Sequence, residues 1–148
     1  MKHRHRGNTR GRGFTLVEIM IVVIILGILG AIVVPQFSSA SSDAQAAALS
    51  SNLQTMRGQI ELYKAQHNGN YPPYATFTNV MTLYSDVNHN TSATKTGAYI
   101  YGPYILAIPP NPYDSSNVVD NVDDNDGGWY YDQTTGNFRT DDGTHDTQ

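Results

Sequence analysis

The chain of 148 residues lacks cysteine altogether and contains few glutamates. Without cysteine there is no disulfide, no thiolate metal ligand and no thiol nucleophile. The two glutamates, Glu18 and Glu61, lie far apart, and no histidine stands at the spacing of a zinc site or a catalytic triad. A Gly-x-Ser-x-Gly motif and a phosphate-binding glycine loop are also missing. We therefore expect a protein that is not an enzyme.

Basic residues are scarce beyond the first thirteen positions. Five of the nine lysines and arginines lie in that segment: Lys2, Arg4, Arg6, Arg10 and Arg12. The other four stand against all thirteen acidic residues, so residues 14–148 carry a formal net charge of −9. Such a charge repels nucleic acid, and we expect no nucleic-acid partner. A basic arm that binds phosphates is the alternative for residues 1–13, but a basic cluster before an apolar run is typical of a cytoplasmic flank.

One long apolar run, residues 14–34, follows the basic segment. As a helix this run would span about 31 Å, which is the thickness of the hydrocarbon core of a bilayer. We expect a single transmembrane helix with its amino terminus in the cytoplasm and the rest of the chain in the periplasm or outside the cell. A secretory signal cleaved near Ser38, Ser39 and Ala40 is the alternative. Its apolar core would be shorter, about 7–15 residues.

Glu18 is the only charged residue inside the apolar run. On insertion scales a carboxylate in the middle of a membrane helix costs on the order of 3 kcal/mol unless it has a partner. A cation within the same membrane layer would provide that partner, so we expect Glu18 to be a functional residue. The alternative is a glutamate near the helix end that reaches the lipid headgroups.

Residues 13–20, Gly-Phe-Thr-Leu-Val-Glu-Ile-Met, and the apolar run after them resemble the class III signal of type IV pilins and of the pseudopilins of type II secretion systems. The resemblance covers residues 11–37. It implies that a prepilin peptidase cuts after Gly13 and methylates the new amine of Phe14. It also implies that subunits leave the membrane lipid to form a helical filament, in which Glu18 pairs with the amine of a neighbouring subunit. Such a pair would fix the register between subunits.

Beyond the span, residues 35–67 predict a continued helix and residues 68–148 a small head. Pro35 is expected to kink the helix without ending it. Larger apolar residues then recur at alternating spacings of four and three, which predicts one buried stripe: Leu49, Leu53, Met56, Ile60 and Tyr63. Asn68 and Gly69 predict a left-handed cap. Short strands at 99–101, 128–131 and 138–139 would form a small antiparallel sheet on the helix, in an α+β pilin-like fold.

Gly102-Pro103-Tyr104 and the proline-rich residues 108–112 are similar to a stretch of the major pseudopilins of type II secretion systems. The similarity ends at Tyr113, where this chain has Tyr-Asp-Ser-Ser. It implies a structural subunit of a pseudopilus that drives protein export, with an inner-membrane assembly platform and minor pseudopilins as partners. A type IV pilin for adhesion or motility is an alternative, although many such pilins close a carboxyl-terminal loop with a disulfide. A membrane-tethered module that binds glycans or surfaces through aromatic residues is a third.

An acidic loop, residues 120–127, contains four aspartates and two asparagines. Calcium takes such oxygen ligands in groups of six to eight, and the major pseudopilins that the chain resembles bind calcium in this region. The order of residues does not match an EF-hand, because Val122 and Gln133 stand where the first and last acidic ligands belong. A calcium ion held by Asp120, Asp123, Asp124 and Asp126 is therefore one interpretation. A solvated acidic loop is the other.

Overall fold

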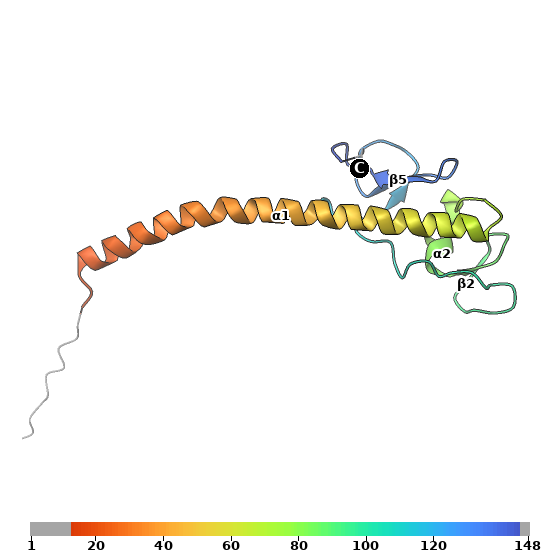
Figure 1. Ribbon diagram of the computed structural model, residues 1–148, viewed down its shortest axis with the longest axis horizontal. Helices are drawn as coiled ribbons and strands as arrows, with labels where there is room; N and C mark the ends of the chain where they lie inside the picture. Colours follow the sequence, from red (N-terminus) through yellow and green to blue (C-terminus); the bar gives the residue numbers. More distant parts are fainter. Residues whose placement is uncertain (1–12, 146–148) are drawn as a thin grey trace, which may run out of the picture. The chain divides into compact units, whose positions relative to one another are not determined.

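The computed structural model describes residues 13–145, except for the side chains of residues 34–39. Most of the predicted leader, residues 1–12, lies outside the described residues. The chain has the α+β pilin-like layout that the sequence predicts, with one long helix followed by short elements (Figure 1). In chain order these are α1 (Leu16–Gln66), η1 (Tyr74–Thr76), α2 (Phe77–Thr82), β1 (Tyr84–Ser85), β2 (Thr91–Ser92), β3 (Val119–Asp120), β4 (Trp129–Asp132) and β5 (Asn137–Thr140).

The first of two compact units ends at Ser41 and contains the amino-terminal part of α1. Leu16–Val33 has a mean hydropathy of 3.0, and none of it is buried by other described parts of the chain. A helix that is apolar on all sides normally lies in a membrane or inside an assembly. α1 continues through position 35 without interruption, and the kink at Pro35 stays a prediction. The segment boundaries expected at residues 13, 34 and 67 also stay predictions.

The second unit begins at Ser42 and is built on the carboxyl-terminal part of α1. All five residues of the predicted stripe, from Leu49 to Tyr63, are buried in this unit. Their spacing places them on one face of α1, and the segments that follow the helix cover that face. The stripe predicted from the sequence is therefore confirmed.

α1 ends after Gln66 with the cap that the sequence predicts. Asn68 and Gly69 have φ angles of 56° and 83°, which is the left-handed region. The Gly69 amide donates to the carbonyl oxygen of Lys64 at 2.9 Å. This bond satisfies one of the carbonyl groups that the helix leaves without a partner.

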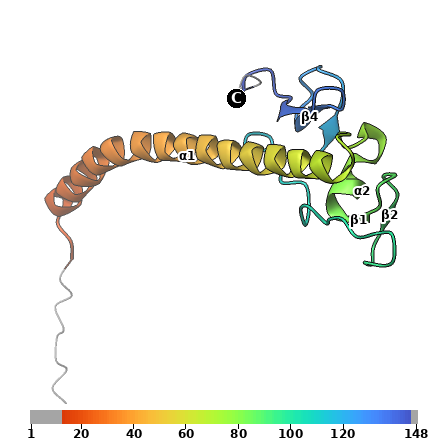
Figure 2. The same ribbon diagram turned by 45° about the vertical axis from the view of Figure 1, so that its right-hand side comes forward.

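Two small sheets follow in the second unit. β1 and β2 form an antiparallel pair, whereas β4 is antiparallel to β5 and parallel to β3. The strands expected at 128–131 and 138–139 are thus confirmed as β4 and β5. Gly136 turns the chain between them with a φ of 76°, and a Cβ atom there would lie 2.2 Å from the Tyr71 ring. In both views the three-stranded sheet and β2 lie on different sides of the end of α1 (Figures 1 and 2).

The strand expected at residues 99–101 is wrong. Tyr99 and Tyr101 form only isolated bridges, with Thr96 and Ser85 respectively. Pro103 follows closely and has no amide hydrogen, so the pairing cannot extend along this segment. The parallel strand β3 is an addition for which the sequence pattern gives no indication.

Aromatic side chains from the three-stranded sheet and α2 complete the core against the stripe. Trp129, Tyr131 and Phe138 are buried, and the ring of Phe77 lies 4.3 Å from that of Tyr131. Trp129 Nε1 donates to the carbonyl oxygen of Pro109 at 2.8 Å, so its polar atom is paired within the core. Burial of these rings stabilises the head.

The proline-rich segment 108–112 is fastened to the same helix. Gln45 Nε2 donates to the carbonyl oxygen of Pro112 at 3.0 Å, and Asn52 Nδ2 donates to that of Pro110 at 3.3 Å. These two side chains of α1 and Trp129 together pair the carbonyl groups of Pro109, Pro110 and Pro112. It holds the loop before β3 against the core.

Candidate functional site

Thr15 and Glu18 form a capping box at the start of α1. The Thr15 backbone amide and its hydroxyl each donate to Glu18 Oε2 at 2.9 Å, and the Glu18 backbone amide donates to Thr15 Oγ1 at 3.2 Å. These bonds satisfy amide groups that have no partner within the helix. They also give the Glu18 carboxylate partners in its own chain, which lowers the cost of placing it at the end of an apolar helix.

These local partners are not among the sequence predictions above, although Thr-x-x-Glu before an apolar run is the signal of a capping box. Both bonds to the carboxylate of Glu18 involve Oε2. Within residues 13–145, Oε1 accepts no hydrogen bond, so this second oxygen is open to a group from another molecule. The capping box therefore orients the Glu18 carboxylate but uses only one of its two oxygens.

Gly13 and Phe14 precede the helix in exposed backbone. A Cβ atom at Gly13 would meet no other atom within 4 Å, and Phe14 is 82% exposed. Packing within the described part of the chain therefore requires neither a glycine at position 13 nor an aromatic residue at position 14. The residues on both sides of this peptide bond are therefore exposed.

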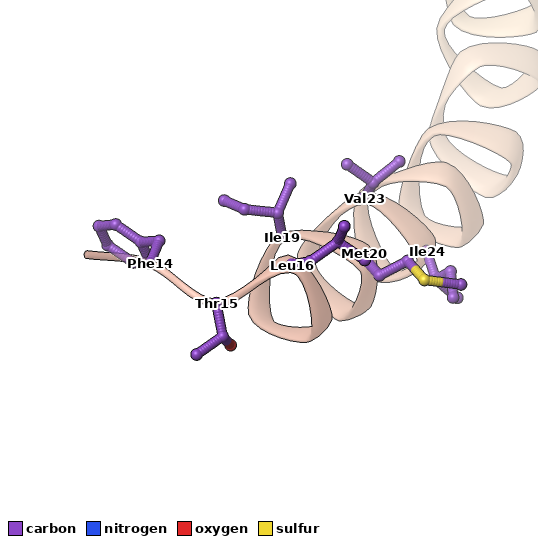
Figure 3. Close-up of a pocket in the computed structure, with 7 residues that line it drawn as sticks. All are labelled: Phe14, Thr15, Leu16, Ile19, Met20, Val23 and Ile24. Carbon is purple, nitrogen blue, oxygen red and sulfur yellow. The ribbon is translucent and has the colours of Figure 1, made fainter.

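An open apolar surface extends from Phe14 along the first turns of α1 (Figure 3). Figure 3 shows Ile19 and Val23 on one side of the helix, with Thr15 pointing to the other. The surface is lined by Phe14, Thr15, Leu16, Ile19, Met20, Val23 and Ile24. Because no described part of the chain buries it, only lipid or another apolar surface can remove it from water.

Three aspartates of the head form an acidic cluster, which we define as Asp124, Asp126 and Asp141. Their ligand oxygens lie within 4.8 Å of one another. Asp124 and Asp126 are exposed in the loop between β3 and β4, whereas Asp141 directly follows β5 and is fully buried. The pairing of Trp129 with Thr140 brings Asp141 beside this loop. Asp141 is not among the ligands predicted from the sequence, because only the register of this hairpin places it there.

Asp141 is a buried carboxylate with one unsatisfied oxygen. Oδ1 accepts a hydrogen bond from the Asn125 amide at 3.1 Å, but Oδ2 has no partner within the described structure. Burial raises the pKa of Asp141, and the nearby charge of Asp124 adds to this effect. Repulsion from Asp124 also raises the pKa of Asp126. Each ionised carboxylate thus disfavours ionisation of its neighbours. A bound divalent cation would instead favour the ionised form of the carboxylates.

The acidic cluster fits a hard cation such as calcium. Its three carboxylates offer up to six oxygens, and calcium takes six to eight, including carbonyl groups and water. An orphaned oxygen on a buried side chain is the kind of group that a bound ion satisfies. The donor set contains no nitrogen or sulfur, which transition metals prefer.

The other two predicted calcium ligands, Asp120 and Asp123, lie outside the acidic cluster. Asp120 Oδ1 accepts hydrogen bonds from the Val122 amide at 3.0 Å and from the Tyr74 hydroxyl at 3.4 Å. Asp123 forms an ion pair with Arg139, whose Nη2 lies 2.6 Å from Asp123 Oδ2. The structure therefore brings together two of the four predicted residues and adds Asp141.

Comparison with known proteins gives one match to the amino-terminal segment and several to most of the chain. Residues 8–34 match the family model described as the prokaryotic N-terminal methylation motif. The chain is 34% identical to the type II secretion system core protein G of Klebsiella pneumoniae, over 72% of this chain and 71% of that protein. It is also 34% identical to the protein of the same name from Aeromonas hydrophila, over 70% of this chain and 68% of that protein.

A shorter match, 45% identical, joins 34% of this chain to 23% of the type IV major pilin protein PilA of Myxococcus xanthus. No solved structure matches the chain significantly. The residues that match the methylation motif include the exposed Gly13 and Phe14 and the capped Glu18. The longer matches cover more of the chain than α1 alone. The chain therefore belongs to the core protein G family, the major pseudopilins of type II secretion systems.

Proposed function

We propose that the chain is the shaft subunit of a type II secretion pseudopilus, which is stored in the inner membrane and polymerised to drive protein export. The observation that carries this proposal is the uncovered apolar helix Leu16–Val33 with Glu18 near its start. Such a helix needs lipid around it before assembly and neighbouring helices after it. The similarity to proteins named core protein G supports the same role.

On this proposal a prepilin peptidase cuts after Gly13 and methylates the amine of Phe14. The open position of Gly13 and the exposure of Phe14 support this step. The basic residues before Gly13 favour a cytoplasmic amino terminus and a periplasmic head. The remaining partners are an inner-membrane assembly platform and minor pseudopilins, and we propose no catalytic role and no nucleic-acid partner.

In the assembled filament, Glu18 pairs with the Phe14 amine of a neighbouring subunit. Thr15 holds Oε2 and orients the carboxylate, while Oε1 remains available for the amine. Two groups that are each unfavourable in an apolar environment are satisfied together, and only in one axial register. The pair therefore selects the stagger between subunits as well as stabilising their contact.

Replacing Glu18 with alanine tests this pairing. We expect Glu18→Ala to be cleaved after Gly13 like the wild type but to give filaments at less than a tenth of the wild-type yield. The matched control is Glu61→Ala, which removes the other glutamate of the chain from an exposed position on α1. The control should keep normal cleavage and yield. A normal filament yield from Glu18→Ala would contradict the pairing.

We also infer that the acidic cluster holds one calcium ion. Asp124, Asp126 and Asp141 would supply carboxylate oxygens, and carbonyl groups or water would complete the coordination. The unsatisfied Oδ2 of Asp141 supports this inference. A bound ion would neutralise the repulsion within the cluster and join the loop before β4 to the segment after β5.

A type IV pilin for adhesion or motility is the second candidate function, and the similarity to PilA favours it. The location of the polymer separates the two candidates. Immunogold labelling of the native cells should show short periplasmic filaments for a pseudopilin and long surface filaments for a pilin. A membrane-tethered binding module would give no polymer at all.

A further inference from the structure

Two histidines lie together where the end of α1 meets the β1–β2 hairpin. His67 follows the last residue of α1 and is fully buried, and His89 lies in the turn between β1 and β2. Their rings are stacked, with centroids 5.3 Å apart and an angle of 16° between the planes. The Tyr63 ring stacks on both, at 3.8 Å from His67 and 5.8 Å from His89. Neither histidine takes part in the proposed assembly or in the acidic cluster.

His67 forms hydrogen bonds through both ring nitrogens. Nδ1 lies 2.9 Å from the carbonyl oxygen of Tyr63, which can only accept, so Nδ1 carries the proton. Nε2 lies 3.2 Å from the Ser85 hydroxyl, within hydrogen-bond distance. His89 Nδ1 is hydrogen-bonded to the Tyr63 hydroxyl. These side chains connect the end of α1 to β1 and to the β1–β2 turn.

The hairpin that they hold is short. β1 and β2 contain two residues each, and the Asp86 amide donates to the carbonyl oxygen of Asn90 at 3.0 Å across the turn. Ser85 and Tyr101 exchange backbone hydrogen bonds of 3.0 and 3.2 Å. An isolated hairpin of this size is marginally stable, so its closure depends on contacts with α1.

The groups that face the two histidines provide a single negative charge near neutral pH. The Asp86 carboxylate accepts hydrogen bonds from the side chain and amide of Asn90, and these bonds lower its pKa. The other titratable neighbours are the hydroxyls of Tyr63, Tyr101 and Tyr104, and Tyr71, which lines the same open pocket as His89. Burial raises the pKa of Tyr104 to about 12 and raises that of Tyr63 as well. Two positive charges in this cluster would therefore share one counter-ion.

We propose that His67 and His89 form a proton-sensitive clasp, which keeps the β1–β2 hairpin closed on the end of α1 at neutral pH and releases it in acid. Opening would expose the buried His67 ring and the partly buried His89 ring fully to water, where an imidazole takes up a proton at about pH 6.5. In the closed hairpin, burial lowers the pKa of His89, and the neighbouring His67 lowers it further while Asp86 opposes them. The open form thus binds more protons below about pH 6.5, and the closed form loses stability as the pH falls.

Hydrogen exchange of the full-length protein in detergent micelles, from about pH 7.5 to about pH 5, tests the clasp. The amides of Asp86 and Tyr101 report on the hairpin, and the amides of β4 and β5 serve as the internal reference. After correction for the intrinsic pH dependence of exchange, protection of the hairpin should fall about tenfold per pH unit below about 6.5 for each proton taken up. Constant hairpin protection, or an equal loss in both sheets, would overturn the proposal.

Three variants assign the effect to the clasp. His89→Asn keeps a residue that tolerates the φ of 67° and should weaken the pH dependence by up to tenfold per pH unit. His67→Gln removes the neighbouring ring that lowers the pKa of His89 and should weaken the pH dependence as well. His145→Gln is the control, because His145 pairs with Asp142 outside the clasp, and it should behave like the wild type. An unchanged pH dependence in His89→Asn would overturn the proposal, even if His67→Gln does not fold.

Discussion

Replacing Asp141 with asparagine should stabilise the calcium-free head and abolish its response to calcium. In the calcium-free protein Asp141 is buried within 4.8 Å of two other carboxylates, and its Oδ2 has no partner in the described structure. The asparagine oxygen can keep the hydrogen bond from the Asn125 amide. Its amino group would replace Oδ2 and could donate to the neighbouring carboxylates.

The expected magnitude follows from the unsatisfied oxygen. A buried polar group without a partner costs about 1–3 kcal/mol, which Asp141→Asn would recover in the absence of calcium. For a head of this size, that corresponds to a rise in melting temperature of roughly 5–15 °C. Calcium at about one hundred times its Kd should stabilise the wild type by about 2.7 kcal/mol. The variant should gain almost nothing, because it lacks one of three charged ligands.

Thermal melts of the full-length protein in detergent, followed by circular dichroism with a chelator or with calcium, provide the assay. Asp43→Asn is the matched control, because Asp43 is an exposed aspartate on α1 outside the acidic cluster. The control should respond to calcium like the wild type. A lower melting temperature of Asp141→Asn in chelator, or an equal response of wild type and variant to calcium, would refute the reasoning.

Three further substitutions test other parts of the account. Gly13→Val should block cleavage, and an amino-terminal peptide that still begins at position 14 would contradict it. Thr15→Val removes the hydrogen bond from the Thr15 hydroxyl to Glu18 at nearly constant side-chain size. It should lower the filament yield while cleavage stays intact, and a normal yield would show that the capping box is dispensable. Leu53→Ala should lower the free energy of unfolding by about 2–5 kcal/mol. Its control, Leu62→Ala on the exposed side of α1, should lower it by about 0.5 kcal/mol, and equal losses would argue against the buried stripe.

The features that the sequence predicts correctly depend on local patterns. The apolar run predicts the helix Leu16–Val33, and the three-and-four spacing from Leu49 to Tyr63 predicts the buried face of α1. The turn around Gly136 predicts the β4–β5 hairpin in the same way. In each case residues close in sequence decide the outcome.

The features that the sequence does not reveal depend on contacts between distant segments. Asp141 reaches Asp124 only through the register of β4 and β5, and the stacking of His67 on His89 requires the β1–β2 hairpin to fold back on α1. The capping box is an exception, because its signal, Thr15 followed three residues later by Glu18, is local and can be read from the sequence. Acidic composition indicates a cation site, but only the fold selects its ligands.

Mass spectrometry of the amino-terminal peptide from native filaments tests the central claim most directly. The claim is that an apolar helix becomes a filament core after cleavage has created an amine that Glu18 can pair with. The account predicts a chain that begins at Phe14 and carries one methyl group on its amine. An intact leader in assembled filaments, or a chain that begins at any other residue, would contradict it.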